Sequence, residues 1–267
     1  MFNKLIDKTN TIFVMKKIIF LFLFFSTSCF VFAQILNAEK YRLDKDTANV
    51  LIGNISFGLN HKSQRTNVFT LYTKANAAYL SKKHSYMLLN NLSIIKVQNA
   101  DPNNNGYAHL RFNFFRKNSI SLEQFNQIQF DAGRGMELRR LTGASVRIRV
   151  LSKPKSTLAF NQGLMYENES WMDSSNEIVR KNYVKSTSHI SYRQKVANRI
   201  NLFLISYYQA RPALFFKPRL ISDFQVQYSF TKRLAFSLQF ESTYDAKPVI
   251  DIQNHIYAIK NKVNIIF

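Results

Sequence analysis

One pair of side chains in this sequence has the types and spacing of a catalytic base and its nucleophile. His189 and Ser191 are separated by a single residue, so they share one face if this segment is a β-strand. An imidazole at that distance can accept the proton of a hydroxyl and activate it for attack on an acyl group. Histidine and serine also recur by chance on polar strand faces. We therefore keep the pair as a catalytic candidate and expect a protein that is not an enzyme.

Basic side chains form a second candidate site. They recur at alternate positions of segments that read as strands, so they share a face. The set is Arg111, Arg139, Arg147, Arg149, Lys185 and Arg193. If this face lines an interior, it either selects anions, as charged rings do in pores, or is neutralised by nearby acids and fills a narrow interior. The acids available for such pairing with the arginines are Glu123, Glu137, Asp223 and Glu241. The sequence leaves both alternatives open.

The N-terminus indicates export. From Met15 the chain has two lysines, an uninterrupted apolar run over 18–25 and a small residue, Ala33, which together predict a signal peptide over 1–33. Met15 is therefore expected to be the start of translation instead of Met1. The apolar run is too short to span a bilayer, which takes about 20 helical residues. The only cysteine, Cys29, lies within this signal, so the mature chain is expected to have no disulfide.

The formal charge of +21 calls for anionic partners. An exported protein does not normally meet nucleic acid, so nucleic acid is excluded as the expected partner. Lipopolysaccharide phosphates and small anionic solutes are the expected counter-charges, and a solvated basic surface without a ligand is the plain alternative. The five histidines are dispersed singly along the chain, so neither a metal site nor any other cofactor is expected.

Alternation of apolar and polar residues is the main structural signal. In 224–230 the apolar residues Phe224, Val226, Tyr228 and Phe230 alternate with Gln225, Gln227 and Ser229. This period indicates a strand with two different faces. The same reading places twelve strands at 48–60, 65–80, 84–98, 106–117, 119–131, 135–151, 155–168, 182–194, 198–209, 217–230, 233–245 and 254–267. Long strands in an even number favour a transmembrane barrel.

The connections between these strands alternate in length. Every second one is short, and the others include the longest polar segments, 98–105, 168–181, 210–216 and 246–253. Outer-membrane barrels have short turns on the periplasmic side and longer loops outside, so this asymmetry favours such a barrel. Trp171 and Met172 in the longest loop could bind a partner, or Trp171 and Tyr166 could belong to an aromatic girdle.

The sixth segment illustrates the two faces of the expected barrel. Met136, Leu138, Ala144, Val146, Ile148 and Val150 are expected to face lipid, and Glu137, Arg139, Gly143, Ser145, Arg147 and Arg149 the interior. The parity also directs His189 and Ser191 inward. Arg140 falls on the apolar parity, so it must lie near a membrane interface or the register is wrong there. Val263, Ile265 and Phe267 end the chain as an alternating apolar strand, typical of the signal read by the barrel assembly machinery.

Several short motifs resemble a known family. They are 137–144 (ELRRLTGA), 162–167 (QGLMYE), 207–209 (YYQ), 223–226 (DFQV), 244–248 (YDAKP) and the terminal Phe267. Together they resemble the family called domain of unknown function 481, described as salt-induced outer-membrane proteins. The resemblance spans most of the mature chain. It implies an outer-membrane β-barrel and a link to salt or osmotic response, and it names neither substrate nor catalytic residue.

The sequence therefore predicts an all-β protein: a signal peptide at 1–33, a periplasmic segment at 34–47 and an antiparallel outer-membrane β-barrel at 48–267. The expected role is structural or the passage of small, anionic solutes through the outer membrane. Two alternatives stay open. The His189-Ser191 pair is similar to the His-x-Ser pairs of outer-membrane phospholipases and lipid A deacylases, and the 168–181 loop could serve a receptor or adhesin.

Overall fold

The computed structural model describes residues 49–63, 67–99, 103–231 and 234–265 of the chain. Within these ranges it forms twelve β-strands and two 3-10 helices, η2 (Ala132–Arg134) and η3 (Pro212–Leu214). The strands are β1 (Val50–Ser63), β2 (Asn67–Leu80), β3 (Ser85–Val97), β4 (Asn105–Phe114), β5 (Ile120–Asp131), β6 (Met136–Lys153), β7 (Ser156–Met172), β8 (Ile178–Ala197), β9 (Ile200–Ala210), β10 (Arg219–Ser229), β11 (Leu234–Asp245) and β12 (His255–Ile265). The expected signal peptide, the 34–47 segment and Phe267 lie outside the described residues.

All twelve expected strands are present, and the all-β antiparallel class is confirmed. Alternation locates strands well because the period of two follows directly from the pleat of the backbone. The strand ends are displaced by a few residues. The largest displacements occur where β7 and β8 extend to Met172 and Ile178, so the long loop expected at 168–181 is only the turn 173–177. That expectation is wrong because polar residues there continue the strand ladder.

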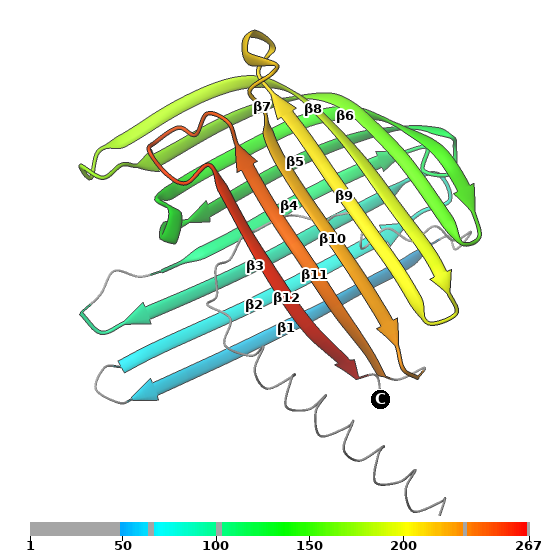
Figure 1. Cartoon of the computed structure of the whole chain (residues 1–267), viewed down its shortest axis with the longest axis horizontal. Helices are drawn as coiled ribbons and strands as arrows, with labels where there is room; N and C mark the ends of the chain where they lie inside the picture. The colour runs from blue at the N-terminus through cyan, green and yellow to red at the C-terminus, as the bar shows by residue number, and fades with distance from the viewer. Residues whose placement is uncertain (1–48, 64–66, 100–102, 232–233, 266–267) are drawn as a thin grey trace, which may run out of the picture. The chain divides into compact units, whose positions relative to one another are not determined.

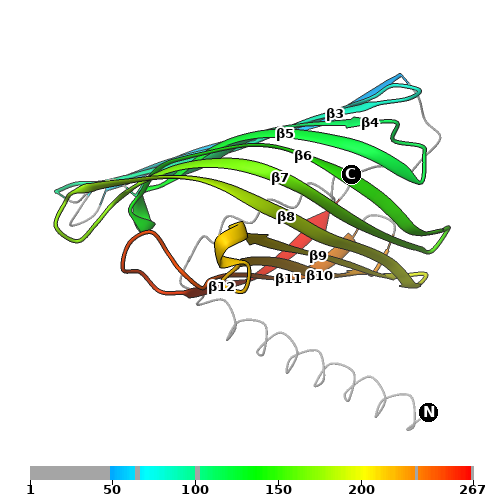
Figure 2. The same cartoon turned by 90° about the horizontal axis from the view of Figure 1, so that it is seen from above.

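The strands follow one another in a single sheet in chain order, and each pairs antiparallel with its chain neighbours (Figure 1). The sheet is strongly curved, so that β9–β12 face the earlier strands across an interior (Figure 2). In the described residues β1 pairs with β2 alone and β12 with β11 alone, so closure into a barrel stays a prediction. No helix among the described residues is both long and apolar enough to cross a membrane.

Burial is inverted relative to a water-soluble sandwich. In β10, Asp223 and Gln225 are 1% and 3% exposed, whereas Phe224 between them is 40% exposed. The same pattern recurs in β4, where His109 and Arg111 are buried and Leu110 is exposed. Buried polar groups must find partners inside the protein, because water cannot solvate them there. The concave face of the sheet is therefore a polar core, and the convex face is apolar.

The beginning of β6 departs from the expected alternation. Met136 is 2% exposed and Glu137 is exposed, the reverse of the expectation. The ladders with β5 and β7 shift register at this point, between Gln129 and Asp131 and between Met136 and Leu138. Such a bulge inserts an extra residue and reverses the parity beyond it. Glu137 is therefore excluded from the polar core, while Arg139 keeps its inward position.

We expect the close approach of β6 and β7 to require glycine at one position. A Cβ on Gly163 would collide with the Ala144 carbonyl oxygen and with Ser145, whereas a Cβ on Gly58 would meet nothing within 4 Å. Gly163→Ala should therefore lower the free energy of unfolding by about 1–3 kcal/mol. Gly58→Ala, the matched control, should change it by less than about 0.5 kcal/mol. Urea unfolding of the refolded variants measures both, and equal effects would contradict the packing described.

Candidate functional site

Two fully buried carboxylates lie on the concave face near the C-terminal end of β7. Glu167 and Glu169 are both 0% exposed. Glu167 forms ion pairs with Arg139 of β6 and Lys185 of β8, and its Oε1 lies 2.9 Å from Nη1 of Arg219 in β10. Glu169 lies 3.3 Å from Nη2 of Arg219. A buried charge is tolerated only when it is paired and hydrogen-bonded, and both carboxylates meet that requirement.

Arg219 extends this arrangement across the interior. Its Nε donates to Oδ2 of Asp245 in β11 at 2.7 Å, while its other nitrogens reach Glu167 and Glu169 on β7. The strands β7 and β10 are not neighbours in the sheet. One guanidinium therefore connects two walls of the curved sheet. We call these six residues, Glu167, Glu169, Asp245, Arg139, Lys185 and Arg219, the ion cluster; its three acids and three bases are formally balanced.

A second group surrounds Glu123 of β5. Its Oε1 accepts a hydrogen bond from Asn113 at 2.7 Å, and its Oε2 accepts one from Asn161 at 3.0 Å. Arg111 lies 3.5 Å and Arg147 lies 3.7 Å from its oxygens. Two guanidinium groups thus lie beside the same buried carboxylate.

A small cavity lies between these groups. A cavity of about 60 Å³ is bounded by Arg111, Glu123 and Arg139 on one wall and by His189 and Tyr207 on the other. A space of this size holds no more than a few water molecules. Here the two walls of the interior pack directly on each other through polar side chains.

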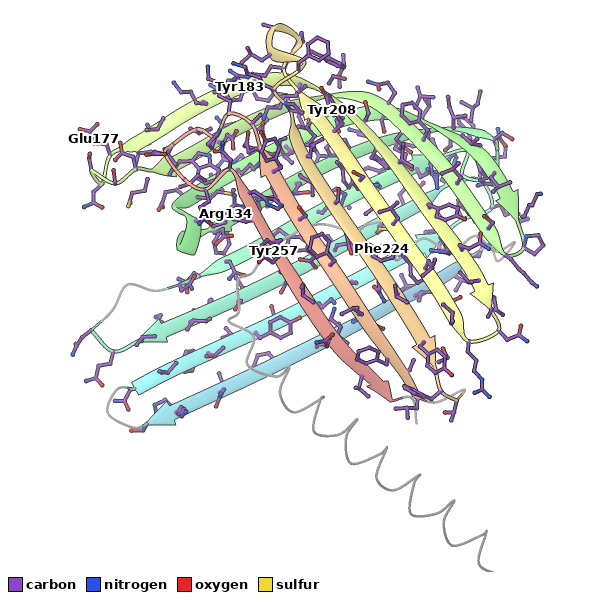
Figure 3. The ribbon with its side chains drawn as sticks, viewed as in Figure 1. Arg134, Glu177, Tyr183, Tyr208, Phe224 and Tyr257 are labelled. Carbon is purple, nitrogen blue, oxygen red and sulfur yellow. The ribbon has the colours of Figure 1, made fainter. Side chains whose placement is uncertain are left out.

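The connections at one end of the sheet cover the ion cluster. Ile250, in the β11–β12 connection, lies beside Gly135 of the β5–β6 turn, because a Cβ placed on Gly135 would be 3.5 Å from its Cδ1. On the same turn lies Arg134, which is labelled in Figure 3. Its guanidinium lies over the ring of Trp171, 5.8 Å from the ring centroid. Burial lowers the pKa of Arg134, and the nearby Asp131 opposes that change. An arginine stays charged nonetheless, so the turn adds a cation above the cluster.

Tyr183 forms the rim at this end. Its ring has Lys185 at 5.3 Å and Arg211 at 4.4 Å, the latter in the β9–β10 connection. Figure 3 shows Tyr183 and Tyr208 near that connection. A ring between two cations stabilises them through its π face and holds both close to the carboxylates below.

The predicted basic cluster is largely brought together. Arg111, Arg139, Arg147 and Lys185 are all buried on the concave face. Arg149 and Arg193 share that face but are half-buried near the short turns, where Arg149 donates to the Arg116 carbonyl and Arg193 lies over Phe203. The arginines therefore do not form one ring. They divide between the Glu123 group, the ion cluster and the short-turn end.

The predicted acidic partners are partly wrong. Glu123 does pair with Arg111 and Arg147. Glu137 is exposed because of the bulge in β6, and Glu167 and Glu169 take its place beside Arg139. Asp223 and Glu241 are both buried, and Gln239 donates to each of them. Glu241 pairs with Lys260 at 2.7 Å, a lysine where an arginine was expected.

His189 and Ser191 lie on the concave face, each 6% exposed. The His189 ring packs against Tyr207 with a centroid distance of 4.6 Å, so its surroundings are those of a packed side chain in the polar core. This inward orientation agrees with the parity argument. It sets the imidazole and the hydroxyl away from the convex face, where a membrane lipid would have to approach.

Trp171 is not in an exposed loop or a girdle. It is 2% exposed, and its indole N–H donates to Oε2 of Glu169 at 3.0 Å. Tyr166 and Met172 are exposed, at 47% and 36%, as a convex position requires. Of the expected assembly signal, Val263 is exposed in β12, Ile265 ends that strand and Phe267 lies outside the described residues.

Four members of the ion cluster were missed by sequence reasoning: Glu167, Glu169, Arg219 and Asp245. Two of them carried a usable signal. Glu167 and Glu169 continue the parity of Asn161 and Met165 along β7, which identifies them as inward once the strand is extended to Met172. Nothing in the sequence indicated the contacts of Arg219, because they join strands that are neither adjacent in sequence nor paired in the sheet.

A family model matches residues 55–254 and is described as a protein of unknown function, DUF481. The chain belongs to the DUF481 family. This confirms the family that the sequence motifs indicate. The DUF481 match runs from β1 to the residue before β12, so it includes every member of the ion cluster. Comparisons with curated proteins and with solved structures gave no match.

We expect removal of one charge from the ion cluster to be strongly destabilising. Glu167→Gln leaves Arg139, Lys185 and Arg219 around a neutral amide, so the free energy of unfolding should fall by about 3–5 kcal/mol. Glu137→Gln makes the same chemical change at an exposed position and should cost less than about 0.5 kcal/mol. Urea titration of both refolded variants measures the difference. Equal stabilities would mean that the cluster does not hold the two walls together.

Proposed function

We propose that this DUF481 protein is an outer-membrane β-barrel with a closed polar interior, which serves a structural role in the membrane instead of forming an open pore. The observation that carries the proposal is the ion cluster, in which Arg219 of β10 reaches Glu167 and Glu169 of β7 across the interior. A side chain that spans the interior obstructs the path that a solute would take.

The surface supports the membrane setting. Apolar residues cover the convex face, among them Leu164, Val184 and Ile190 at 60%, 57% and 47% exposure. In water, molecules with such an apolar face would tend to associate, whereas lipid accommodates the face. An antiparallel sheet can satisfy its backbone groups in lipid only by closing, so the proposal includes pairing of β1 with β12.

Aromatic contacts near the strand ends support the same setting. At the short-turn end Tyr86 packs on Tyr79 and Phe112 with centroid distances of 6.1 and 5.7 Å. At the other end Tyr208 packs on Phe215 at 5.3 Å. Outer-membrane barrels have aromatic girdles at both interfaces, where the rings contact both lipid and headgroups.

The basic side chains favour one alternative, the passage of small anions. Arg111 and Arg147 both lie beside Glu123 in the interior, where cationic side chains would attract an anion. The small size of the cavity beside them, about 60 Å³, and the reach of Arg219 across the interior both oppose an open route. The closed interior is therefore preferred.

The other two alternatives have weaker support. A lipid hydrolase would need His189 and Ser191 to face its substrate, yet both are buried on the concave face. A receptor acting through the β7–β8 connection would need Trp171 to be accessible, yet its indole is hydrogen-bonded to Glu169.

Ionic conductance in a planar lipid bilayer tests the proposal. After insertion has been verified, the wild-type protein should give no steady current under a salt gradient, because the ion cluster and the packed walls obstruct the interior. An open porin inserted in the same bilayer is the control. Steady anion-selective openings that change when Arg147 and Arg149 are both replaced by Ala would overturn the closed interior in favour of an anion pore.

A further inference from the structure

Arg140 is a cation on the apolar, convex face of the sheet. It is exposed, and in the ladders it stands opposite Ile128 of β5 and Asn168 of β7. No hydrogen bond or ion pair engages its guanidinium within the described ranges. A lone charge facing lipid costs about 2–4 kcal/mol at the membrane midplane and less near an interface. An arginine kept in this position calls for an anionic partner from outside the chain.

The surface beside Arg140 is hollowed. A groove of about 610 Å³ crosses the convex face from β3 to β7, and Arg140 is part of its lining. Its apolar part is formed by Leu88, Leu110 and Ile128, each exposed by 36–46%. Ala108, a small residue, lies between them and leaves the depth that a larger side chain would fill. The groove is open to the convex surface along these apolar side chains.

The end of the groove near Arg140 is polar. Asn126 accepts a hydrogen bond from Thr142 at 2.7 Å, and Asn168 donates one to Asn182 at 2.5 Å. Tyr166, 47% exposed, also lines this end. Each amide is engaged by a residue of a neighbouring strand, which leaves the guanidinium as the unmatched charge. An apolar trough that ends in one cation has the polarity of a lipid with an acyl chain and an anionic headgroup.

We propose that this groove binds one membrane lipid that carries a phosphate headgroup. The phosphate would be held by the Arg140 guanidinium, whose planar set of N–H donors matches phosphate oxygens in a bidentate manner. One acyl chain would lie along Leu88, Leu110 and Ile128. The inference rests on the proposed function, because only a membrane-embedded convex face meets such a lipid. Charge complementarity favours this occupant over a second copy of the chain, whose own convex face would present another Arg140.

Native mass spectrometry of protein released from vesicles tests the proposal. The wild-type protein is reconstituted in phosphatidylcholine vesicles that contain a minor fraction of lipid A, which carries phosphomonoester groups. We expect one retained lipid A per protein. Arg140→Gln should weaken binding of the lipid about tenfold, because it removes the charge-assisted hydrogen bonds to the phosphate. Arg140→Lys should retain part of it.

Two further variants separate the parts of the site. Arg180→Gln removes an exposed arginine from β8, outside the lining of the groove, and should leave occupancy unchanged. Ala108→Phe keeps Arg140 but fills the trough and should reduce occupancy as strongly as Arg140→Gln. An excess of inorganic phosphate should not displace the lipid, because free phosphate has no acyl chain. Displacement by phosphate would overturn the lipid as the occupant.

Protease protection in the same vesicles separates this inference from the proposed function. A wild-type protein that fails to insert would contradict the outer-membrane barrel itself. A protein that inserts but retains lipid A equally in the wild type and in Arg140→Gln would overturn the lipid site alone. A dimer without bound lipid, lost in Arg140→Gln, would assign the groove to a second copy and likewise overturn it.

Discussion

Burial of Glu167 and Glu169 sets the strongest constraint on this structure. An ionised carboxylate without solvent is strongly unfavourable unless cations and hydrogen bonds surround it. The neighbouring strands β6 and β8 supply Arg139 and Lys185, and the further cation, Arg219, comes from β10 across the interior. The sheet must curve enough to bring β10 within reach of β7. The charges can therefore pair only if the sheet is curved. The same curvature brings β10 close to β7 across the interior.

The period of two explains how much of the fold could be predicted. It identified twelve strands and the inward parity of Arg111, Arg147 and Lys185, because each of these depends only on local backbone geometry. It failed at Met136 and Glu137, where a bulge reverses the parity. It also ended β7 too early, because the polar residues of the polar core resemble those of a loop. In a sheet with a polar interior, hydrophilicity does not distinguish strand from connection.

The candidate site was harder to predict than the fold. Alternation tells which residues face inward, but it carries no information on which inward residues meet. Arg139 pairs with Glu167 and Glu169 on the adjacent strand, where the register decides the partner. The sequence does not reveal that register, so Glu137 is wrongly expected as an acidic partner of the arginines. The contact of Arg219 with Glu167 depends on the curvature of the whole sheet. The groove at Arg140 was likewise visible in sequence only as an anomalous charge on the apolar parity.

The chain-order arrangement of the strands has a consequence for how the protein assembles. Every backbone ladder among the described residues joins strands that are consecutive in the chain, so this part of the sheet can grow one hairpin at a time with short loops to close. The bond between Arg219 and Glu167 is different, since it joins residues 52 positions apart. Until β10 arrives, Glu167 and Glu169 lack one of their cations, and a partly built sheet stays less curved and less stable. The last strands therefore complete the charge balance of strands that are already in place.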